Sequence, residues 1–598
     1  MKAKNLKVEY LTDPIGIDIV RPRFSWNFDS GIRQSAYQLV ATDEHGNTLW
    51  DSGKVESSQM HLIEWGAEDL KSRTIVNWRV TVWDESGLAE TSDEAHFEIG
   101  LLHQNDWKAK WITGNYVPKK KERYPVDCFR KHFSTKSGTK VVRARAYMTA
   151  CGVYEGQLNG KKIGDFILAP GITDYRKRVQ YQTVDISDLV RTGDNELTFM
   201  LADGWYRGSV GAWAMKNYYG TETKLLAQIE IAYDDGTVIA TDDTFEWTNE
   251  GPIRFADNKD GEIYDARRDG MSGTDWKSVK LTKHNVIPCA SNNFPLVEQE
   301  KLTNPKLIIT PSGKKVLDFG QNIEGIVAFT VNAKAGQRIF LRFGELMKNG
   351  EFTQKNIQCV KKELKTPLQQ IEYFCKDGIN EYKTRFAIFG YQYIEVEADM
   401  DIEASAFTAI AVYSDFETTF SFDSSNKLLN KFVQNTLWSL KNNSADLPTD
   451  CPTRERHGWS GDAQIFVNTA SYMVNYAPFA LKYENDLCDW QGEDGNFPQI
   501  APEGGTDTYM RTMNGSVGWS DAGILIPYRL WKKYGDRRVI DKYYDNMKRY
   551  AKYMINRTGK TQFIISEKTG LSKADSKYLY NIGQHYGEWA EPEDVHAM

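Results

Sequence analysis

The sequence lacks the features that mark a membrane protein or a nucleic-acid-binding protein. It has no run of about 18 apolar residues, so no transmembrane helix is expected. The formal net charge is −7 and the basic residues form no stripe, so nucleic acid is not an expected partner. The lysines of the opening "MKAKNLKVEY" are followed by no apolar stretch. No signal peptide is therefore visible, and the cytoplasm is the predicted location.

Cysteine is scarce and scattered. The seven cysteines form no Cys-x-x-Cys pair and lie at positions 128, 151, 289, 359, 375, 451 and 488. This odd number and wide spacing fit neither a disulfide framework nor a zinc site. The sequence therefore predicts reduced thiols, and no cofactor is expected from this class of residue.

Aromatic residues are abundant. Phe, Trp and Tyr make up 13% of the chain, including 17 Trp and 31 Tyr. Such a surplus is typical of sugar-binding proteins, whose rings stack on pyranose faces, and also of large β-sandwich cores. Composition alone favours the second explanation, large β-sandwich cores. At 598 residues the chain is too long for one hydrophobic core, so several domains are expected.

Residues 1 to about 415 have the patterns of β-strands, with short alternating runs separated by Gly, Asn and Asp turns. Residues 35–55 predict a hairpin that turns at Gly46, and a second hairpin is predicted to turn at Asp234-Asp235-Gly236. We predict three β domains: a fibronectin-III-like or immunoglobulin-like sandwich over 1–103, a jelly-roll sandwich over 104–298, and a further β-sandwich over 299–415.

The pattern changes to helices near residue 420. Apolar residues recur at helical spacing at Leu428, Leu429, Phe432, Val433, Leu437 and Leu440. Ser424 or Ser425 is expected to cap this first helix, over 426–441. Further helices are predicted over 461–475, 477–490, 521–535 and 539–557. Strands followed by helices predict a multidomain protein, with β-sandwich domains before a separate helical domain.

The stretch "DLPTDCPTRERHGWSGDAQ", residues 446–464, forms a long charged loop between two predicted helices. Loops of this length in compact helical regions are often functional. The loop can bring the carboxylates of Asp450, Glu455 and Asp462 together beside Trp459. A carboxyl group among carboxylates has a raised pKa and can act as a general acid, as in a glycoside hydrolase. A salt-bridged loop with Asp462 as a helix cap explains the same pattern.

The string "DCPTRERHGWSGDAQ" closely resembles the catalytic motif of bacterial α-L-rhamnosidases, glycoside hydrolase family 78. The resemblance continues in "EYLTDPIGIDIVRPRFSWNF", "GVYEGQLNGKKIGDFILAPGITDYRKRVQYQT", "LADGWYRG" and "VLDFGQNIEG". It implies that the helical region is part of an (α/α)6 barrel that holds the active site. The implied activity is hydrolysis of terminal α-L-rhamnose from rhamnosides, with inversion. Carried onto this sequence, the motif makes Glu455 the general acid and gives as substrate-binding residues Asp450, Arg454, Trp459 and Asp462.

The resemblance is less complete toward the end of the chain. Trp519 and Trp589 resemble aromatic residues that line the same pocket, although packing in the barrel core explains them as well. Glu588 replaces the Asp that usually precedes the second tryptophan. An inverting enzyme also needs a carboxylate base, which in the family is a Glu late in the barrel, and no residue here matches it. We therefore expect an incomplete barrel with weak or absent activity, and open helix faces that favour a homo-oligomer.

Two other functions are consistent with the sequence. A non-catalytic protein that binds rhamnose or another carbohydrate is the main alternative, because the jelly-roll region near Asn159 resembles a calcium-dependent rhamnose site of some relatives. Leu158 stands where an acidic ligand would help, so the calcium ligands look incomplete. Another α/α-barrel enzyme, such as a lyase or a glucosidase, is opposed by the "DCPTRE" motif. The expected partners are rhamnose-containing glycosides or oligosaccharides.

Overall fold

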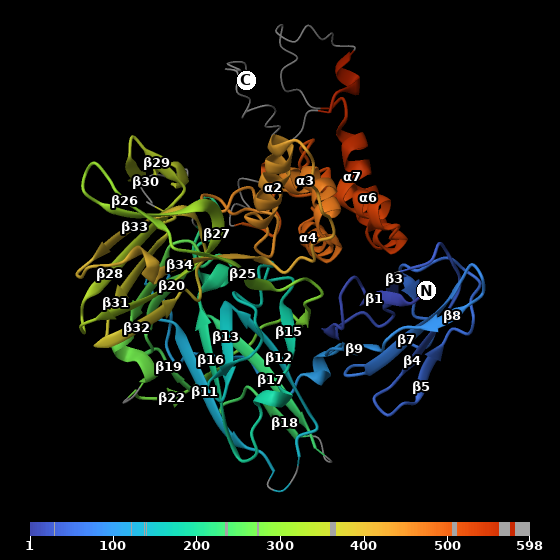
Figure 1. Ribbon diagram of the computed structural model, residues 1–598, viewed down its shortest axis with the longest axis horizontal. Helices are drawn as coiled ribbons and strands as arrows, with labels where there is room; N and C mark the ends of the chain where they lie inside the picture. Colours follow the sequence, from blue (N-terminus) through green and yellow to red (C-terminus); the bar gives the residue numbers. More distant parts are fainter. Residues whose placement is uncertain are drawn as a thin grey trace. The chain divides into compact units, whose positions relative to one another are not determined.

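The computed structural model divides the chain into two compact units (Figure 1). The β unit comprises Met1–Ser209, Lys216–Gln354 and Leu368–Asp415, and the helical unit comprises Val210–Met215, Lys355–Pro367 and Phe416–Met598. The structure describes all residues except 29, 121, 137, 139, 214, 234–236, 272–273, 359–365, 505–510, 561–574 and 581–598. None of the helices in the described residues has the length and apolar character needed to cross a membrane. The predicted order, β domains followed by helices, is confirmed.

The first part of the β unit is a sandwich of two sheets, ordered β1-β3-β6 and β2-β9-β7-β4-β5, with β8 beside β7. β4 and β5 form the predicted hairpin, in which Gly46 has a φ of 84° that favours glycine. Phe24 and Trp78 are buried in the core with ring centroids 4.8 Å apart. The strands are β1 (Ala3–Val8), β2 (Ile15–Ile17), β3 (Arg23–Phe28), β4 (Gln34–Thr42), β5 (Thr48–Asp51), β6 (Ile63–Glu64), β7 (Ile75–Asp84), β8 (Ala89–Thr91) and β9 (Ala95–Ile99).

The second part has two larger sheets, ordered β23-β10-β17-β12-β15-β24 and β14-β13-β16-β11-β19-β22, with β18 beside β17. Inward side chains alternate along β16, where Leu197, Phe199 and Leu201 join one buried cluster. β17 and β18 form the second predicted hairpin, and its turn lies outside the described residues. The elements are β10 (Ile112–Thr113), β11 (Asp127–Ser134), β12 (Arg143–Cys151), β13 (Val153–Leu158), β14 (Lys161–Lys162), β15 (Gln180–Asp185), β16 (Asp194–Ala202), α1 (Gly204–Arg207), β17 (Lys224–Ala232), β18 (Thr237–Ala240), β19 (Glu246–Thr248), β22 (Lys277–Ser278), β23 (Lys280–Leu281) and β24 (Cys289–Ala290).

The third part is a ten-stranded sheet with the central order β20-β21-β31-β28-β33-β27-β34-β25. β26 and β32 both pair with the 19-residue strand β27, which also pairs with β33 and β34. β20 and β21 precede residue 298 in the sequence, yet they pair in this sheet. The strands are β20 (Ile253–Asp257), β21 (Gly261–Asp265), β25 (Leu296–Thr303), β26 (Lys306–Ile309), β27 (Lys315–Ala333), β28 (Arg338–Gly344), β31 (Gln370–Phe374), β32 (Gly378–Lys383), β33 (Phe389–Ala398) and β34 (Phe407–Ser414), with the separate hairpin β29 (Leu346–Lys348) and β30 (Glu351–Thr353).

The helical unit contains the five predicted helices, each within two residues of the expected ends. They are α2 (Lys427–Lys441), α3 (Ser460–Met473), α4 (Ala477–Asp489), α6 (Ala522–Tyr534) and α7 (Arg537–Arg557). The predicted N-cap of α2 is wrong. Asn426 caps the helix, because its side chain accepts hydrogen bonds from the backbone N–H groups of Leu428 at 3.0 Å and Leu429 at 3.2 Å. Ser424 instead donates its hydroxyl to Asn430.

Replacing Asn426 by alanine should lower the free energy of unfolding of the helical unit by about 1 kcal/mol, because two N–H groups lose their acceptor. Urea denaturation followed by the helical circular dichroism signal measures this change. Ser425→Ala is the matched control at an exposed neighbouring position, with an expected effect within about 0.5 kcal/mol. Equal effects of the two substitutions would show that Asn426 is not the cap.

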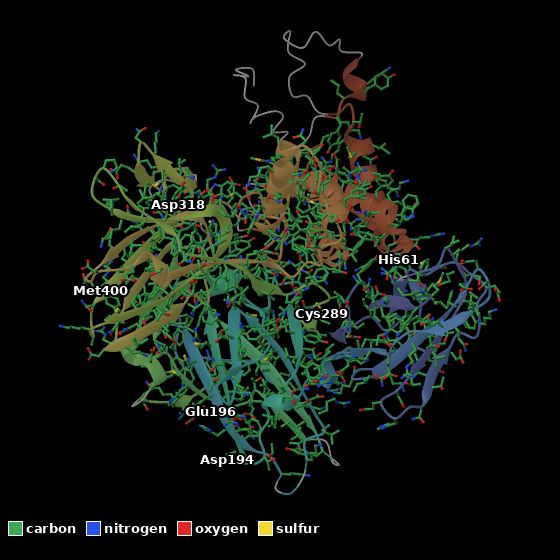
Figure 2. The ribbon with its side chains drawn as sticks, in the orientation of Figure 1. His61, Asp194, Glu196, Cys289, Asp318 and Met400 are labelled. Carbon is green, nitrogen blue, oxygen red and sulfur yellow. The ribbon has the colours of Figure 1, made fainter. Side chains whose placement is uncertain are left out.

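Two surface features bear on the remaining predictions. Apolar residues of α2 and α3 are open to solvent, with exposed fractions of 83% for Leu428, 66% for Phe432 and 71% for Ile465. These are the open helix faces that the sequence predicted, and self-association stays a prediction. The six cysteines that the structure describes are free thiols, including Cys289 in the edge strand β24 (Figure 2).

Candidate active site

A cavity of about 1020 Å³ lies in the helical unit, between the loop that precedes α3 and the segment that precedes α6. Six of the residues singled out in the sequence line it: Asp450, Arg454, Glu455, Trp459, Asp462 and Trp519. Trp589, the seventh, lies outside the described residues. The structure therefore brings together every candidate residue that it describes.

The loop between α2 and α3 is held in a strained conformation beside Glu455. Arg456 has a φ of 53°, in the left-handed region that side chains with a Cβ rarely adopt. Its buried guanidinium fixes this turn, because Nε donates to the carbonyl of Pro452 at 2.9 Å. The Glu455 backbone N–H also points back to the sulfur of Cys451, at 3.3 Å. The turn directs the Glu455 side chain into the cavity.

Both oxygens of the Glu455 carboxylate have a donor. The indole N–H of Trp459 donates to Oε2 at 2.9 Å, and Nη2 of Arg454 lies 3.0 Å from Oε1. The side chain of Glu455 is 15% exposed, whereas that of Arg454 is 40% exposed. Trp459 therefore orients the carboxylate while it also forms part of the cavity wall, and Arg454 keeps further N–H groups within reach of solvent.

The pKa values of two neighbouring carboxyl groups are raised. Burial, and then the negative charge of Glu455, raise the pKa of Asp450 to about 7. Burial also raises the pKa of Asp462, and Glu455 adds to this effect. The raised pKa values therefore belong to Asp450 and Asp462, the two carboxyl groups that the motif assigns to substrate binding.

Asp450→Asn should stabilise the helical unit at about pH 8 and leave its stability unchanged at about pH 4. The folded state holds the proton of Asp450 more tightly than the unfolded chain does, because the pKa of this carboxyl group is near 3.8 in the unfolded chain. Stability is therefore lost as the pH rises from about 4 through about 7, and asparagine removes this loss. Its amide oxygen can still accept the His457 N–H bond that Asp450 accepts at 3.1 Å.

Urea denaturation at both pH values measures this difference. Asp541→Asn, at an exposed position of α7, is the control and should show no such pH dependence. An Asp450→Asn variant that is equally stable relative to wild type at the two pH values would contradict the raised pKa.

Two glycines are required by close approaches in the site. A Cβ on Gly458 would lie 2.1 Å from the carbonyl oxygen of Ala501, and the Gly458 carbonyl accepts a bond from the Tyr483 hydroxyl at 2.7 Å. A Cβ on Gly461 would lie 2.7 Å from the indole of Trp519. These contacts fix the loop and place the Trp519 ring against the start of α3.

Sequence reasoning missed the residues that anchor the loop from elsewhere in the chain. Lys482 of α4 is buried, and its Nζ lies 3.4 Å from Oδ2 of Asp446 and 3.0 Å from Oδ2 of Asp486. His457 is buried as well, and its Nε2 accepts the backbone N–H of Ala212 at 2.9 Å. Ala212 belongs to Val210–Met215, the piece of the β-rich region that groups with the helical unit. No local pattern signals either contact.

The described residues contain no group of three or more His, Cys, Asp or Glu side chains placed to hold a metal ion. In the jelly-roll region considered for calcium, the Asn159 amide is engaged within the fold. It accepts from the Glu196 N–H at 3.0 Å and donates to the Leu189 carbonyl at 2.9 Å. These bonds leave Asn159 poorly placed as a calcium ligand.

Four stretches of the chain match domain families of one group of enzymes. Residues 3–103 match the Rha78A-like N-terminal immunoglobulin domain, and 139–310 match the alpha-L-rhamnosidase N-terminal domain. Residues 308–413 match the bacterial alpha-L-rhamnosidase concanavalin-like domain, and 417–597 match the bacterial alpha-L-rhamnosidase 6 hairpin glycosidase domain. The chain belongs to the bacterial α-L-rhamnosidase family. The fourth match places the cavity in the glycosidase domain of this family.

Individual α-L-rhamnosidases resemble the chain over nearly all of its length. The enzyme of Alteromonas sp. (strain LOR) is 34% identical over 92% of this chain and 62% of its own length. One from Formosa agariphila is 32% identical over 92% of this chain and 61% of its own length. The crystal structure of Streptomyces avermitilis α-L-rhamnosidase complexed with L-rhamnose has a TM-score of 0.85 at 27% identity, covering 93% of this chain and 71% of that one. The chain thus spans about three fifths of the length of the two curated relatives.

Proposed function

We propose that the chain carries the acid half of an α-L-rhamnosidase site, for inverting hydrolysis of terminal α-L-rhamnosides. The observation that supports this most directly is the Glu455 carboxylate, oriented by the Trp459 indole N–H within a cavity that also contains Asp450 and Asp462. A relative that binds L-rhamnose shares the fold at a TM-score of 0.85. The proposed site residues follow from this arrangement together with the motif.

In this proposal Glu455 protonates the glycosidic oxygen as the bond to the rhamnose anomeric carbon breaks. Trp459 holds the side chain in place during this step. Asp450 and Asp462 hydrogen-bond rhamnose hydroxyls, and a carboxyl group near its pKa can donate as well as accept. Arg454 adds N–H donors at the open side, and Trp519 closes the apolar wall with the Trp459 ring.

Inversion also needs a base on the opposite side of the sugar, roughly 6.5–9.5 Å from the acid. Within the described residues, the carboxylates that line the cavity are Asp450, Glu455 and Asp462, all from one short stretch. These three are assigned to the acid and to hydroxyl binding, so none of the described carboxylates in the cavity is left for the base. We therefore propose that turnover by the 598-residue chain is slow or absent. The free thiols fit a reducing compartment, so the proposed location is the cytoplasm.

Titration of the full chain with L-rhamnose, with binding monitored by saturation-transfer NMR, tests substrate binding separately from turnover. We expect L-rhamnose to bind, and L-fucose, an isomer with different hydroxyl stereochemistry, to bind at least about tenfold more weakly. Asp462→Asn should weaken the binding of L-rhamnose about tenfold or more, because a charged hydrogen-bond acceptor is lost. Equal binding of the two sugars, or no binding of either, would overturn the proposal.

A non-catalytic rhamnose-binding protein is the alternative. The engaged Asn159 amide gives it no support in the jelly-roll region considered for calcium. Binding of L-rhamnose that survives Asp462→Asn and disappears with EDTA would favour this alternative over the helical cavity.

A further inference from the structure

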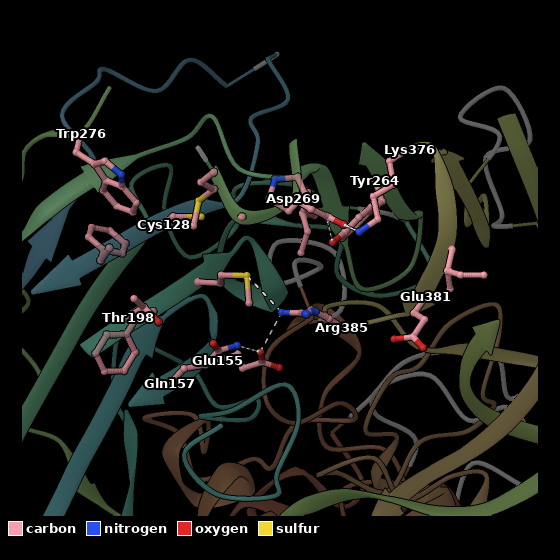
Figure 3. Close-up of a pocket in the computed structure, with 18 residues that line it drawn as sticks. Cys128, Glu155, Gln157, Thr198, Tyr264, Asp269, Trp276, Lys376, Glu381 and Arg385 are labelled. Carbon is pink, nitrogen blue, oxygen red and sulfur yellow. Dashed lines mark hydrogen bonds and ion pairs between the residues drawn. The ribbon is translucent and has the colours of Figure 1, made fainter. Parts of the chain in front are cut away.

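A second cavity, of about 650 Å³, lies within the β unit (Figure 3). Its walls come from β11, β13 and β16 on one side and from β21 and the segment Lys376–Arg385 on the other. We call it the junction cavity. Its volume falls within the roughly 300–1,000 Å³ typical of small-molecule sites. It is formed without Asn159 and without any residue of the helical unit.

The walls of the junction cavity are fixed by backbone pairing. β21 pairs in parallel with β31 over five residue pairs, and the rings of Tyr264 and Tyr373 stack 5.3 Å apart across this pairing. The buried carboxylate of Glu262 accepts the backbone N–H of Arg385 at 2.9 Å and the hydroxyl of Tyr382 at 2.6 Å. The position of Arg385 is therefore set before any ligand arrives, which lowers the entropy lost on binding.

Four of the five charged residues that line the cavity form two compensated pairs, and the fifth, Glu381, is an exposed carboxylate. Nη1 of Arg385 lies 3.1 Å from Oε1 of Glu155, and the same oxygen accepts from Gln157 at 3.2 Å (Figure 3). Lys376 lies 2.7 Å from Asp269. Because the contacts of the Arg385 side chain with other described residues use Nη1, its Nε and Nη2 can donate to a ligand. The cavity therefore offers strong hydrogen-bond donors and acceptors, and its only charge excess is one negative charge, from Glu381.

The indole ring of Trp276, which we call the aromatic plate, completes the site. Trp276 lines the cavity, and the Arg130 guanidinium lies over its ring at 4.2 Å. Arg130 is held in turn by Glu246, at 2.6 Å. The Trp276 side chain is half-buried and lines the cavity, so an apolar surface of a ligand can pack against the ring face that Arg130 does not cover. The buried side chains of Phe129 and Phe199 form an apolar part of the cavity wall.

An aromatic plate beside charge-compensated hydrogen-bonding groups suits a neutral ligand with many hydroxyls and apolar C–H faces. A phosphate-bearing or strongly acidic ligand would need an excess of basic residues, and the two basic residues here are both paired with carboxylates. A purely apolar ligand would displace water from the Nε and Nη2 donors of Arg385 without replacing its hydrogen bonds. We propose that the junction cavity binds a neutral oligosaccharide. This inference does not depend on hydrolysis in the helical unit.

A glycan array of neutral and acidic oligosaccharides, probed with the full chain, tests the proposal. We expect at least one neutral oligosaccharide to bind, with calorimetry giving its dissociation constant. Trp276→Ala and Arg385→Met should each raise that constant about ten- to a hundredfold. Glu455→Gln should leave it unchanged, which separates this site from the helical cavity.

Matched controls lie elsewhere in the β unit. Trp83→Ala removes an indole that also packs with a cation, Lys54, at 5.1 Å, and Arg338→Met removes a half-exposed arginine paired with Glu372. Neither should change binding, and thermal unfolding checks that each variant folds. Gln157→Leu replaces Arg385→Met if the latter does not fold. Binding of acidic oligosaccharides alone, no binding, or binding that survives the cavity variants would each overturn the proposal.

Discussion

Replacing Lys482 by methionine should lower the free energy of unfolding of the helical unit by about 3–5 kcal/mol, the cost of breaking a buried charge pair from one side. The ammonium group lies between Asp446 and Asp486, and all three side chains are buried. Burial opposes the charge of Lys482, and the two carboxylates outweigh this effect, so its pKa is raised. Methionine fills a similar volume but leaves both acids without the cation.

Urea denaturation of the full chain, followed by the helical circular dichroism signal, measures this loss. Lys542→Met is the matched control on α7, because that lysine is exposed and should change stability by no more than about 0.5 kcal/mol. Adding Asp486→Asn to Lys482→Met should recover part of the loss, since one uncompensated charge is removed. A loss of stability no larger than that of Lys542→Met would show that the ion pairs of Lys482 with Asp446 and Asp486 do not hold the loop.

The elements that the sequence predicted correctly are those that local periodicity determines. The helices α2, α3, α4, α6 and α7 follow apolar spacing, and the β4–β5 hairpin follows a glycine turn. The predicted N-cap of α2 was one or two residues away from the actual cap, Asn426. Ser424, Ser425 and Asn426 are all favourable N-cap residues, and only the backbone geometry selects one of them. The pairing of β21 with β31 joins residues about a hundred positions apart, and no local pattern encodes it.

The same distinction applies to the candidate site. Glu455, Asp450 and Asp462 were found together because they lie in one loop, where sequence proximity implies spatial proximity. The contact between Ala212 and His457 spans 245 positions, so neither residue carried a signal. The raised pKa was predicted for the group of carboxylates but could not be assigned to Asp450 without the burial that the fold supplies.

Glu455→Gln should lower the azide-supported cleavage of phenyl α-L-rhamnoside by about 10²–10⁴, the usual contribution of a general acid. Sodium azide can be added so that the assay needs no base. In the expected reaction azide bonds to the anomeric carbon from the face opposite the phenol, the carbon–oxygen bond breaks, and Glu455 transfers its proton to the phenolate oxygen. The products are phenol and β-L-rhamnosyl azide, because the displacement inverts the anomeric centre.

A better leaving group separates proton donation from positioning. Dinitrophenolate leaves without a proton, so Glu455→Gln should slow azide-supported cleavage of the dinitrophenyl rhamnoside far less than that of the phenyl rhamnoside. Glu493→Gln, at an exposed position of the helical unit, should affect neither substrate. Equal losses with both substrates would make Glu455 a positioning residue, and an α-azide product would contradict inversion. A strong dependence on the leaving group, seen only in Glu455→Gln, would identify the proton donor as Glu455, the carboxyl group that accepts the Trp459 hydrogen bond.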